Sequence, residues 1–470
     1  MMTSINLAEL SSILGAVLSA NASTFADAPE CAGMAPIQAV EIDSRRVQSG
    51  DLFIAVPGAR VDGHDFVNKA AARGAIAAVV ERDVSTTLPC LKVSNSLTAL
   101  TQIAAANREI FSGVLVAITG SCGKTSVKNM CRSIFRRQGI TVATAGNYNN
   151  EIGVPLTLAK LNDDTQYAVV EMGATGRGDI AHLCGLARPG ISTVLNAMEA
   201  HLDGFGSVAD VAGIKAEIYD GLDSQGFAIL NLDQPWVPLW RERIAASGAR
   251  TLSYSINHEA DITASSVQSL GLQGSRFTLN ASGQSRSLLL PLPGQHNIAN
   301  ALAAAALASA AGVSFDAIVA GLSDCDAEPG RLHSETLSGG TVLIDDSYNA
   351  NPGSVRAAID LLAETPGTRT LILGEMLELG DESASKHAEM GARAKAQGIQ
   401  LFVSVGEAVS PAALAFGEGA QQFPDRDSLS AALPELLEAS DSILVKGSRG
   451  AAMEAVLQDL RAIAQRGASC

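Results

Sequence analysis

The sequence predicts an α/β protein of three domains, at residues 1–95, 96–326 and 327–470, and three observations support this prediction. The chain has 470 residues, which is too many for one hydrophobic core and fits about three domains of roughly 150 residues each. Residues 114–139 read as a buried strand, a glycine turn and an amphipathic helix, a unit typical of parallel sheets. From residue 341 to residue 446, short apolar runs alternate regularly with helical patterns, as in a doubly wound sheet.

The composition excludes several classes of protein. Apolar residues make up 47% of the chain, so we expect a globular rather than a disordered protein. The 33 Lys and Arg against 49 Asp and Glu give a net charge of −16, which disfavours general binding of nucleic acid or anionic membranes. Any anionic substrate must therefore be held by local groups such as loop amides, Mg²⁺ and individual Arg or Lys side chains.

The seven cysteines are scattered and odd in number, and no C-x-x-C pair occurs among them. This pattern predicts a reducing cytoplasm and argues against a structural zinc site or a disulfide framework. Residues 13–22 are apolar, but the first basic residue is Arg45 and Glu9 lies where a signal peptide carries positive charge. We therefore predict an amphipathic helix there, and a cytoplasmic protein that does not insert into membranes. Separately, we expect a monomer.

The first domain is predicted from residues 41–80, which hold short strand candidates and an Ala-rich helix. Asp43, Ser44 and Arg45 lie in a loop before the strand candidate at 51–56. Loops of this kind carry function more often than packing. Asp-Ser-Arg alone is most often solvated surface, however, so the spacing leaves ligand binding open.

The central domain is organised around a strand, a turn and a helix. Residues 114–118 form a continuous apolar run, as expected of a strand buried on both faces of a parallel sheet. The apolar residues of 127–135 recur at i, i+3, i+4, i+7 and i+8, which is one face of a helix, and Gly139 is suited to end it. Between strand and helix lies the turn Thr-Gly-Ser-Cys-Gly-Lys-Thr, residues 119–125.

This turn predicts a phosphate-binding site, because turn amides and the helix N-terminus all present N–H groups to an anion. Lys124 would reach the β- and γ-phosphates of a nucleotide, and the Thr125 hydroxyl would hold Mg²⁺. The full P-loop pattern needs glycine at position 118, which is Ile118, so this is the shortened form T-G-x-x-G-K-T. We assign nucleotide binding to Gly120, Ser121, Cys122, Gly123, Lys124, Thr125 and Ser126.

Polar residues follow the neighbouring strands. The strand at 167–170 ends in Glu171, on the sheet edge where ligands bind, and a Mg²⁺ ligand suits that position. The strand at 191–195 ends in the same region, and His201 beyond it would project toward Glu171. The loop at 145–153 is rich in Asn, for which turn formation is the simpler explanation. Nothing in the spacing distinguishes Lys215, on a helix opened by Ser207, from an ordinary solvated lysine.

Residues 251–292 predict an antiparallel β insertion, and the next helix begins with His296, Asn297 and Asn300, whose spacing gives weak support for a purine site.

In the last domain we predict strands at 341–345, 370–373, 401–405 and 442–446. No G-x-G-x-x-G follows the first of these strands, which argues against a nicotinamide cofactor. Instead Asp345 opens the segment D-D-S-Y-N-A-N-P at the strand's carboxyl end, where a ligand crevice would lie.

These segments together resemble the Mur ligases, the amide-forming ligases of peptidoglycan synthesis, over nearly the whole chain. The resemblance rests on T-G-S-C-G-K-T-S-V-K, E-M-G-A, H-N-I-A-N, and the D-S-R loop ahead of G-D-L-F-I-A and D-G-H-D-F. The segments A-G-N-Y-N-N-E-I-G-V-P and D-D-S-Y-N-A-N-P are similar to the member that adds a dipeptide. The resemblance implies a UDP-binding N-terminal domain, a central P-loop ATPase domain, and a C-terminal Rossmann-like domain that binds the incoming dipeptide.

The resemblance also implies residue roles that the spacing did not. The expected catalytic residues are Lys124, His201 and Lys215, and the family has a lysine carbamylated by CO₂ at the position of Lys215. The expected metal ligands are Thr125, Glu171, His201 and Lys215. Beyond the loop, ATP would meet Asn147, His296, Asn297, Asn300, Arg331 and Asp345. The other substrates would meet Asp43, Ser44, Arg45, Asn149, Asn150, Tyr348, Asn349, Asn351, Lys446 and Arg449.

The implied activity joins D-alanyl-D-alanine to UDP-N-acetylmuramoyl-tripeptide through an acyl phosphate, with ATP and Mg²⁺. One alternative is the Mur ligase that adds the third residue, and another is a folylpolyglutamate synthase, which the D-S-R domain disfavours. A third is a nucleotide-regulated switch protein, although a GTPase would show N-K-x-D, which the sequence lacks. The sequence does not distinguish lysine from diaminopimelate as the third residue of the acceptor peptide.

Overall fold

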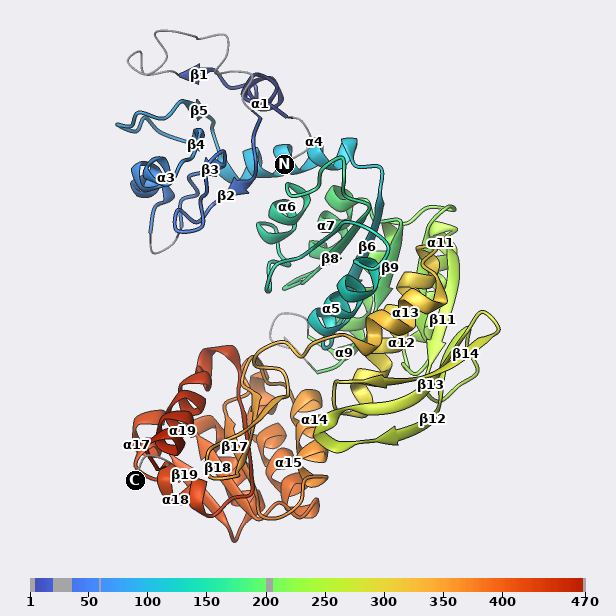
Figure 1. The fold of residues 1–470 in the computed structure, drawn as a ribbon, viewed down its shortest axis with the longest axis vertical. Coiled ribbons are helices and arrows are strands. Elements are labelled where there is room, and N and C mark those ends of the chain that lie inside the picture. The colour runs from blue at the N-terminus through green and yellow to red at the C-terminus, as the bar shows by residue number, and fades with distance from the viewer. Residues whose placement is uncertain (1–4, 20–35, 59–60, 200–205, 468–470) are drawn as a thin grey trace.

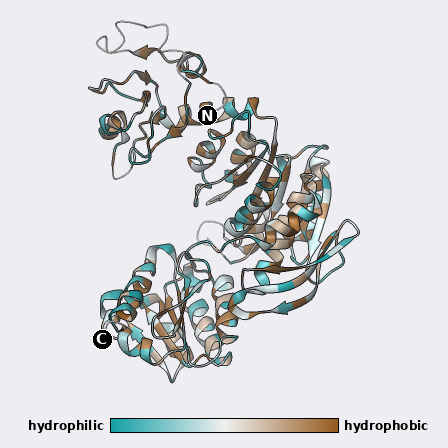
Figure 2. Ribbon diagram, in the orientation of Figure 1, coloured by the Kyte–Doolittle hydropathy of each residue, from teal (hydrophilic) through white to brown (hydrophobic). Residues whose placement is uncertain are grey.

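The computed structural model describes residues 5–19, 36–58, 61–199 and 206–467. Three sheet-containing domains follow one another along an arc, with the N-terminal and C-terminal domains at its two ends (Figure 1). This confirms the predicted three-domain α/β architecture. Figure 2 shows that apolar residues concentrate on the strands inside the domains, as burial on both sheet faces requires.

The N-terminal domain is a five-stranded sheet of order β1-β5-β4-β3-β2, parallel except for the β1–β5 pair. Its elements are α1 (Leu7–Leu14), β1 (Leu18–Ser19), β2 (Val40–Glu41), β3 (Leu52–Ile54), the 3₁₀ turn η1 (Gly63–Phe66), α3 (Val67–Ala72), β4 (Ala77–Val80) and β5 (Cys90–Lys92).

The helix predicted at residues 13–22 is wrong in position. Helix α1 begins after Asn6, whose side chain accepts hydrogen bonds from the first turn, and Glu9 completes the capping box. It ends at Gly15, which adopts φ +58. Leu18 then pairs with β5, so the apolar run continues as a strand, and residues 20–22 lie outside the described part.

Helix α4 (Ser96–Ile110) connects the first two domains and belongs to both cores. Leu100 and Ile103 pack in the N-terminal core, whereas Ala104 packs in a core of the central domain. The N-terminal core also includes Leu156 of α6, so the boundary between the first two domains is a packed interface.

The central domain is built on a nine-stranded sheet of order β14-β13-β12-β11-β10-β9-β6-β8-β7. Its strands are β6 (Val114–Thr119), β7 (Thr141–Ala143), β8 (Tyr167–Glu171), β9 (Ile191–Val194), β10 (Phe227–Asn231), β11 (Arg250–Ser255), β12 (Ile262–Ser269), β13 (Ser275–Ala281) and β14 (Gln284–Leu290). Its helices are α5 (Lys124–Phe135), α6 (Gly153–Leu158), α7 (Asp179–Ala187), α9 (Val208–Lys215), α10 (Glu217–Asp220), α11 (Val237–Ser247), η2 (Gly271–Gln273), α12 (Gln295–Ala310) and α13 (Phe315–Ser323).

The antiparallel insertion is shorter than predicted. Strand β11 pairs in parallel with β10, and β12 in parallel with β11, so both continue the main sheet. Antiparallel pairing begins between β12 and β13 and continues to β14. The prediction was wrong for residues 251–255, because apolar alternation in a short strand does not reveal the direction of its partner.

The C-terminal domain is a six-stranded sheet of order β15-β16-β20-β17-β18-β19, parallel except for β15. Its strands are β15 (His333–Thr336), β16 (Val342–Asp346), β17 (Arg369–Gly374), β18 (Leu401–Val405), β19 (Ala420–Phe423) and β20 (Ser442–Lys446). Its helices are α14 (Pro352–Ala363), η3 (Gly380–Glu382), α15 (Ser383–Ala396), η4 (Glu407–Val409), α16 (Ser410–Phe416), α17 (Arg426–Ser430), α18 (Leu433–Glu438), η5 (Arg449–Ala451) and α19 (Glu454–Gly467). The four predicted strands are present, and the edge strands β15 and β19 are additional.

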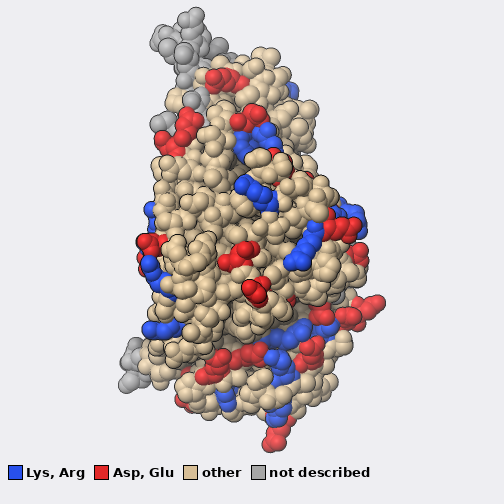
Figure 3. All heavy atoms as spheres, turned by 90° about the vertical axis from the view of Figure 1, so that its right-hand side faces the viewer, with Lys and Arg blue, Asp and Glu red and all other residues tan. Residues whose placement is uncertain are grey.

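Charged residues of both signs are interspersed on the face shown in Figure 3, most densely over its lower part. Among the described residues, no helix has the length and apolar character needed to cross a membrane.

Candidate active site

The turn after β6 has a backbone that only glycine accommodates. Gly120 adopts φ +156 and Gly123 adopts φ +84, the latter directly before the first residue of α5. A Cβ on Gly123 would lie 2.5 Å from Oδ1 of Asn300 at the start of α12. The turn therefore needs glycine both for its conformation and for close contact with α12.

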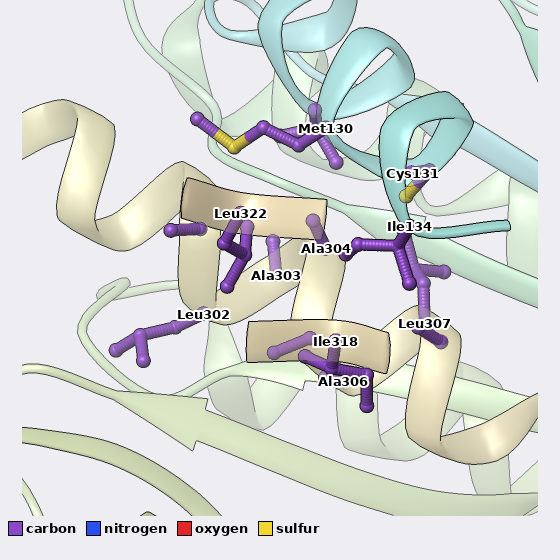
Figure 4. Close-up of a cluster of buried hydrophobic side chains, with 14 of the residues drawn as sticks. Met130, Cys131, Ile134, Leu302, Ala303, Ala304, Ala306, Leu307, Ile318 and Leu322 are labelled. Carbon is purple, nitrogen blue, oxygen red and sulfur yellow. The ribbon is translucent and has the colours of Figure 1, made fainter. Parts of the chain in front are cut away.

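Helix α5 is fixed by its apolar face. Met130, Cys131 and Ile134 pack against residues of α12 and α13, including Leu307 and Ile318 (Figure 4). The predicted helical face at 127–135 is therefore buried as expected. Because this packing holds the helix, its N-terminal amides stay directed at the turn in front of it.

The turn is also held from β9, by a residue that sequence reasoning missed. Asn196 follows that strand and accepts hydrogen bonds from the Ser121 amide (3.1 Å, through its carbonyl) and from the Cys122 amide (2.9 Å, through Oδ1). Its Nδ2 donates to the Cys122 carbonyl at 3.1 Å. The only signal in the sequence was an amide side chain just after an apolar strand, on the edge where ligands bind.

A carboxylate, a hydroxyl and an amide converge beside the turn. Thr125 Oγ1 lies 3.0 Å from Glu171 Oε2, and Asn149 Nδ2 donates to Glu171 Oε1 at 2.8 Å. Lys128 Nζ lies 3.9 Å from the same carboxylate, and Lys124 Nζ donates to the Gly120 carbonyl at 2.7 Å. Hard oxygen donors beside a phosphate loop suit Mg²⁺, which needs only one or two protein ligands when phosphates supply the rest.

Arg331 reaches this group from the segment that leads into the C-terminal domain. Its Nη2 lies 3.1 Å from Thr125 Oγ1, and its guanidinium lies 4.1 Å from the centre of the Tyr348 ring. The segment 328–331, predicted as a turn, therefore delivers a positive charge to the phosphate-binding turn.

Lys215 is buried, which corrects the expectation of a solvated side chain. Helix α9 starts at Ser207, whose hydroxyl accepts from the Asp210 amide, and it ends at Lys215. Only 2% of Lys215 is exposed, and it lines the cleft described below. Burial, together with the nearby positive charge of Lys124, lowers its pKa from 10.5 to about 7. A large fraction of this amine is therefore neutral near neutral pH.

The start of α12 is internally hydrogen-bonded. Asn297 Nδ2 donates to the Pro293 carbonyl at 2.7 Å, and Asn300 Nδ2 donates to Asn297 Oδ1 at 3.1 Å. Both Asn side chains are mostly buried beside the turn, and His296 lines the same cleft.

The C-terminal domain contributes a buried ion pair. Lys446, at the end of β20, lies 2.5 Å from Asp346 Oδ2 and donates to the Asn349 carbonyl at 2.9 Å. Asp346 lines the cleft and Asp345 does not, so the predicted contact of Asp345 with ATP stays a prediction. Successive strand residues face opposite ways, and Asp345 instead accepts hydrogen bonds from Ser347.

These groups surround one cleft of about 730 Å³ between the central and C-terminal domains. It is lined by all predicted loop residues from Gly120 to Ser126 and by Asn147, Asn149, Asn150, Glu171, Lys215, His296, Asn297, Asn300, Arg331, Tyr348, Asn349, Asn351 and Lys446. Residues that were not predicted also line it, among them Thr175, Asp179, His182, Asp233 and Asn257. Their only shared sequence signal is a position after a strand or at a helix start.

Other predicted residues lie elsewhere. Asp43 and Arg45 form an ion pair at 2.7 Å in the N-terminal domain, and this pairing lowers the pKa of Asp43 to about 2. Ser44 beside them is buried, and none of the three lines the cleft. Arg449 also lies outside its lining and pairs with Glu454 at 3.3 Å.

His201 lies outside the described residues, so its predicted approach to Glu171 has no structural counterpart here.

A phosphate-binding turn, a nearby carboxylate and a cleft closed by a Rossmann-like domain define a nucleotide-dependent ligase of three domains. Family models agree in chain order: Mur ligase family, catalytic domain, over residues 36–111; Mur ligase middle domain over 118–308; and Mur ligase, glutamate ligase domain, over 330–449. The chain belongs to the Mur ligase family.

Among its relatives is the UDP-N-acetylmuramoyl-tripeptide–D-alanyl-D-alanine ligase of Escherichia coli, 45% identical over 90% of this chain and 94% of that protein. A crystal structure of MurF from Acinetobacter baumannii matches with a TM-score of 0.86 at 33% identity, covering 97% of this chain and 98% of that one. MurF from Thermotoga maritima, in complex with ADP, matches with a TM-score of 0.77 at 26% identity, covering 91% and 98%.

Proposed function

We propose that the protein is an ATP-dependent ligase that joins D-alanyl-D-alanine to UDP-N-acetylmuramoyl-tripeptide, giving the pentapeptide precursor of peptidoglycan. The observation that carries this proposal is the single cleft that contains both the phosphate-binding turn and the buried Asp346–Lys446 pair of the C-terminal domain. Relatives named for this activity match along nine-tenths of the chain. We assign sugar-nucleotide binding to residues 1–95, ATP binding to 96–326 and dipeptide binding to 327–470.

The first step transfers the γ-phosphoryl group of ATP to the terminal carboxylate of the tripeptide. Two anions must approach each other, so the site has to offset their repulsion. Lys124, the turn amides and Arg331 present positive charge where negative charge develops in the transition state. Asn147 also lines the cleft and would approach the γ-phosphate, while His296, Asn297 and Asn300 would hold the adenine.

Mg²⁺ would be held by Thr125 and Glu171, whose oxygens lie 3.0 Å apart, and it would neutralise phosphate charge when bound. Lys215 is suited to form a carbamate with CO₂, because only the neutral amine is nucleophilic and its pKa is about 7. The carbamate carboxylate and His201 would complete a second metal position.

The second step is attack of the dipeptide amine on the acyl phosphate, followed by loss of phosphate. Tyr348, Asn349, Asn351, Lys446 and Arg449 would hold the dipeptide, with Asn149 and Asn150 beside the acceptor. The Asp43–Ser44–Arg45 loop would bind the uridine diphosphate end. We further propose that the enzyme acts as a monomer in the cytoplasm.

The test is phosphate release from ATP and Mg²⁺ with UDP-N-acetylmuramoyl-tripeptide, with and without D-Ala-D-Ala, together with the mass of the product. We expect phosphate and pentapeptide only when all substrates are present. Acceptors ending in lysine and in diaminopimelate are compared in parallel, and a single amino acid replaces the dipeptide to test the third-residue ligase. Lys124→Ala should keep the fold and lose the reaction; ligation by that variant, or equal phosphate release without an acceptor, contradicts the proposal.

A further inference from the structure

Residues 196–199, which follow β9 and are the described part of the next loop, contact two parts of the site at once. At its first residue, Asn196 makes three hydrogen bonds to the phosphate-binding turn. Met198 adds two more, since its amide donates to Ser121 Oγ at 3.0 Å and its carbonyl accepts from the same hydroxyl at 3.3 Å. The position of this loop and the position of the turn are therefore tied together.

At its last residue the loop contacts the C-terminal domain. Glu199 Oε1 accepts from Lys386 Nζ of α15 at 2.7 Å, and Glu199 Oε2 accepts from Arg356 Nη2 of α14 at 3.3 Å. The three side chains are only 19–35% exposed, so screening by water is incomplete. The hydrogen bond that Lys386 donates to Glu199 also raises the pKa of Lys386.

The same approach of domains brings reactive groups together. Asn351, which caps α14, places Nδ2 3.0 Å from Cys122 Sγ in the turn, and Arg331 reaches Thr125. A Cβ on Gly353 would lie only 3.0 Å from Met198 Sδ, so α14 lies close against the loop. Helix α14 therefore takes part in both sets of contacts, through Arg356 at Glu199 and through its capping residue Asn351 at the turn.

We propose that Glu199 is a positioning residue that docks the C-terminal domain onto the phosphate-binding turn by pairing with Lys386 and Arg356. Within the described part of the chain, its carboxylate contacts Lys386 and Arg356 and no group of the turn. It acts through the loop, because residues 196–199 form hydrogen bonds with Ser121 and Cys122 and also pair with side chains of α14 and α15. Ion pairs across the domain boundary therefore favour the arrangement in which Arg331 and Asn351 meet the turn.

The inference rests on the proposed function for its kinetic test but not for its structural one. Glu199→Gln removes the charge and keeps the shape. We expect kcat/KM for the dipeptide to fall by about tenfold, equivalent to about 1.4 kcal/mol. The affinity for Mg-ADP should change less, because most of the groups assigned to the nucleotide lie on the central domain. Wild-type activity should fall as salt rises, and the variant should respond less to salt.

The matched control is Asp360→Asn. Asp360 of α14 pairs with Arg393 of α15 at 2.7 Å, with similar exposure, but this pair lies within the C-terminal domain. We expect little change in kcat/KM for it. An equal loss in both variants would mean that the effect is one of stability, and it would overturn the proposal.

Small-angle scattering with ADP and Mg²⁺, without the other substrates, tests docking directly. Glu199→Gln should give a larger radius of gyration than wild type and Asp360→Asn, and the double variant Glu199→Gln with Lys386→Met should give no further increase beyond the first. Identical scattering of all variants would refute the docking role even if the ligase assay succeeds. Absent ligation by wild type would refute the proposed function instead.

Discussion

Replacing Lys215 by methionine should make the protein more stable and inactive. Methionine has a similar unbranched shape and no charge, so it fits the buried site at the end of α9. In the folded protein the pKa of Lys215 is lowered from 10.5 to about 7. Lowering the pKa from 10.5 to about 7 corresponds to about 5 kcal/mol of unfolding free energy.

The sign follows from proton binding. Between pH 7 and 10.5 the unfolded chain keeps the proton on Lys215 and the folded chain does not, so wild-type stability rises with pH in this window. Below pH 7 the full free-energy cost of burying the charged amine of Lys215 is present. The advantage of Lys215→Met should therefore be at most about 4 kcal/mol at pH 7.5 and should shrink by roughly 3 kcal/mol by pH 9.5.

Urea unfolding followed by tryptophan fluorescence measures this difference in unfolding free energy in the central domain, which contains Lys215. The two tryptophans, Trp236 and Trp240, both lie at α11 of the central domain, and Trp240 donates to the Ala212 carbonyl of α9 itself. Buffers are depleted of CO₂ so that the amine stays unmodified. Lys160→Met is the control, since Lys160 is partly exposed. If Lys215→Met is less stable than wild type at both pH values, or if the difference does not change with pH, the reasoning is refuted.

Three further substitutions test the phosphate-binding turn. Gly123→Ala forces a left-handed backbone, at about 1–2 kcal/mol, and pushes Asn300 aside, so Mg-ADP binding measured by calorimetry should weaken about tenfold or more; unchanged affinity would contradict this. Asn196→Ala removes the acceptor of the Cys122 amide and the donor to the Cys122 carbonyl, at about 1–3 kcal/mol. It should lower both the melting temperature and ADP affinity, whereas an unchanged melting temperature would argue against its role. Glu171→Gln keeps the size of the side chain but loses the negative charge that would bind the metal. Ligation at saturating ATP should fall by about 100-fold with little change in melting temperature. Activity near that of wild type would show that Glu171 is not a metal ligand.

The turn and its helix were predictable because their signals are local. Glycines at positive φ, a lysine and threonine at a helix start, and an apolar helical face all lie within one short segment, and the structure contains each of them. Glu171 was predictable for a similar reason, since an apolar parallel strand ends there.

The remaining features depend on contacts between distant segments. The burial of Lys215 is set by the elements that pack around α9, so its own helix gave no sign of it and only the family resemblance singled it out. Asn196 acts through the turn more than seventy residues earlier. Asp346 rather than Asp345 lines the cleft because side chains alternate along a strand, so neighbouring residues face opposite sides of the sheet.

Helix α4 has a consequence for how the molecule melts. The helix contributes Leu100 and Ile103 to the N-terminal core and Ala104 to a core of the central domain. Unfolding of either core therefore removes packing contacts from the other. A calorimetric scan should therefore resolve two cooperative transitions, one for the first two domains as a unit and one for the last. An excised fragment ending at residue 95 would leave a gap where those helix side chains belong, and would aggregate rather than fold.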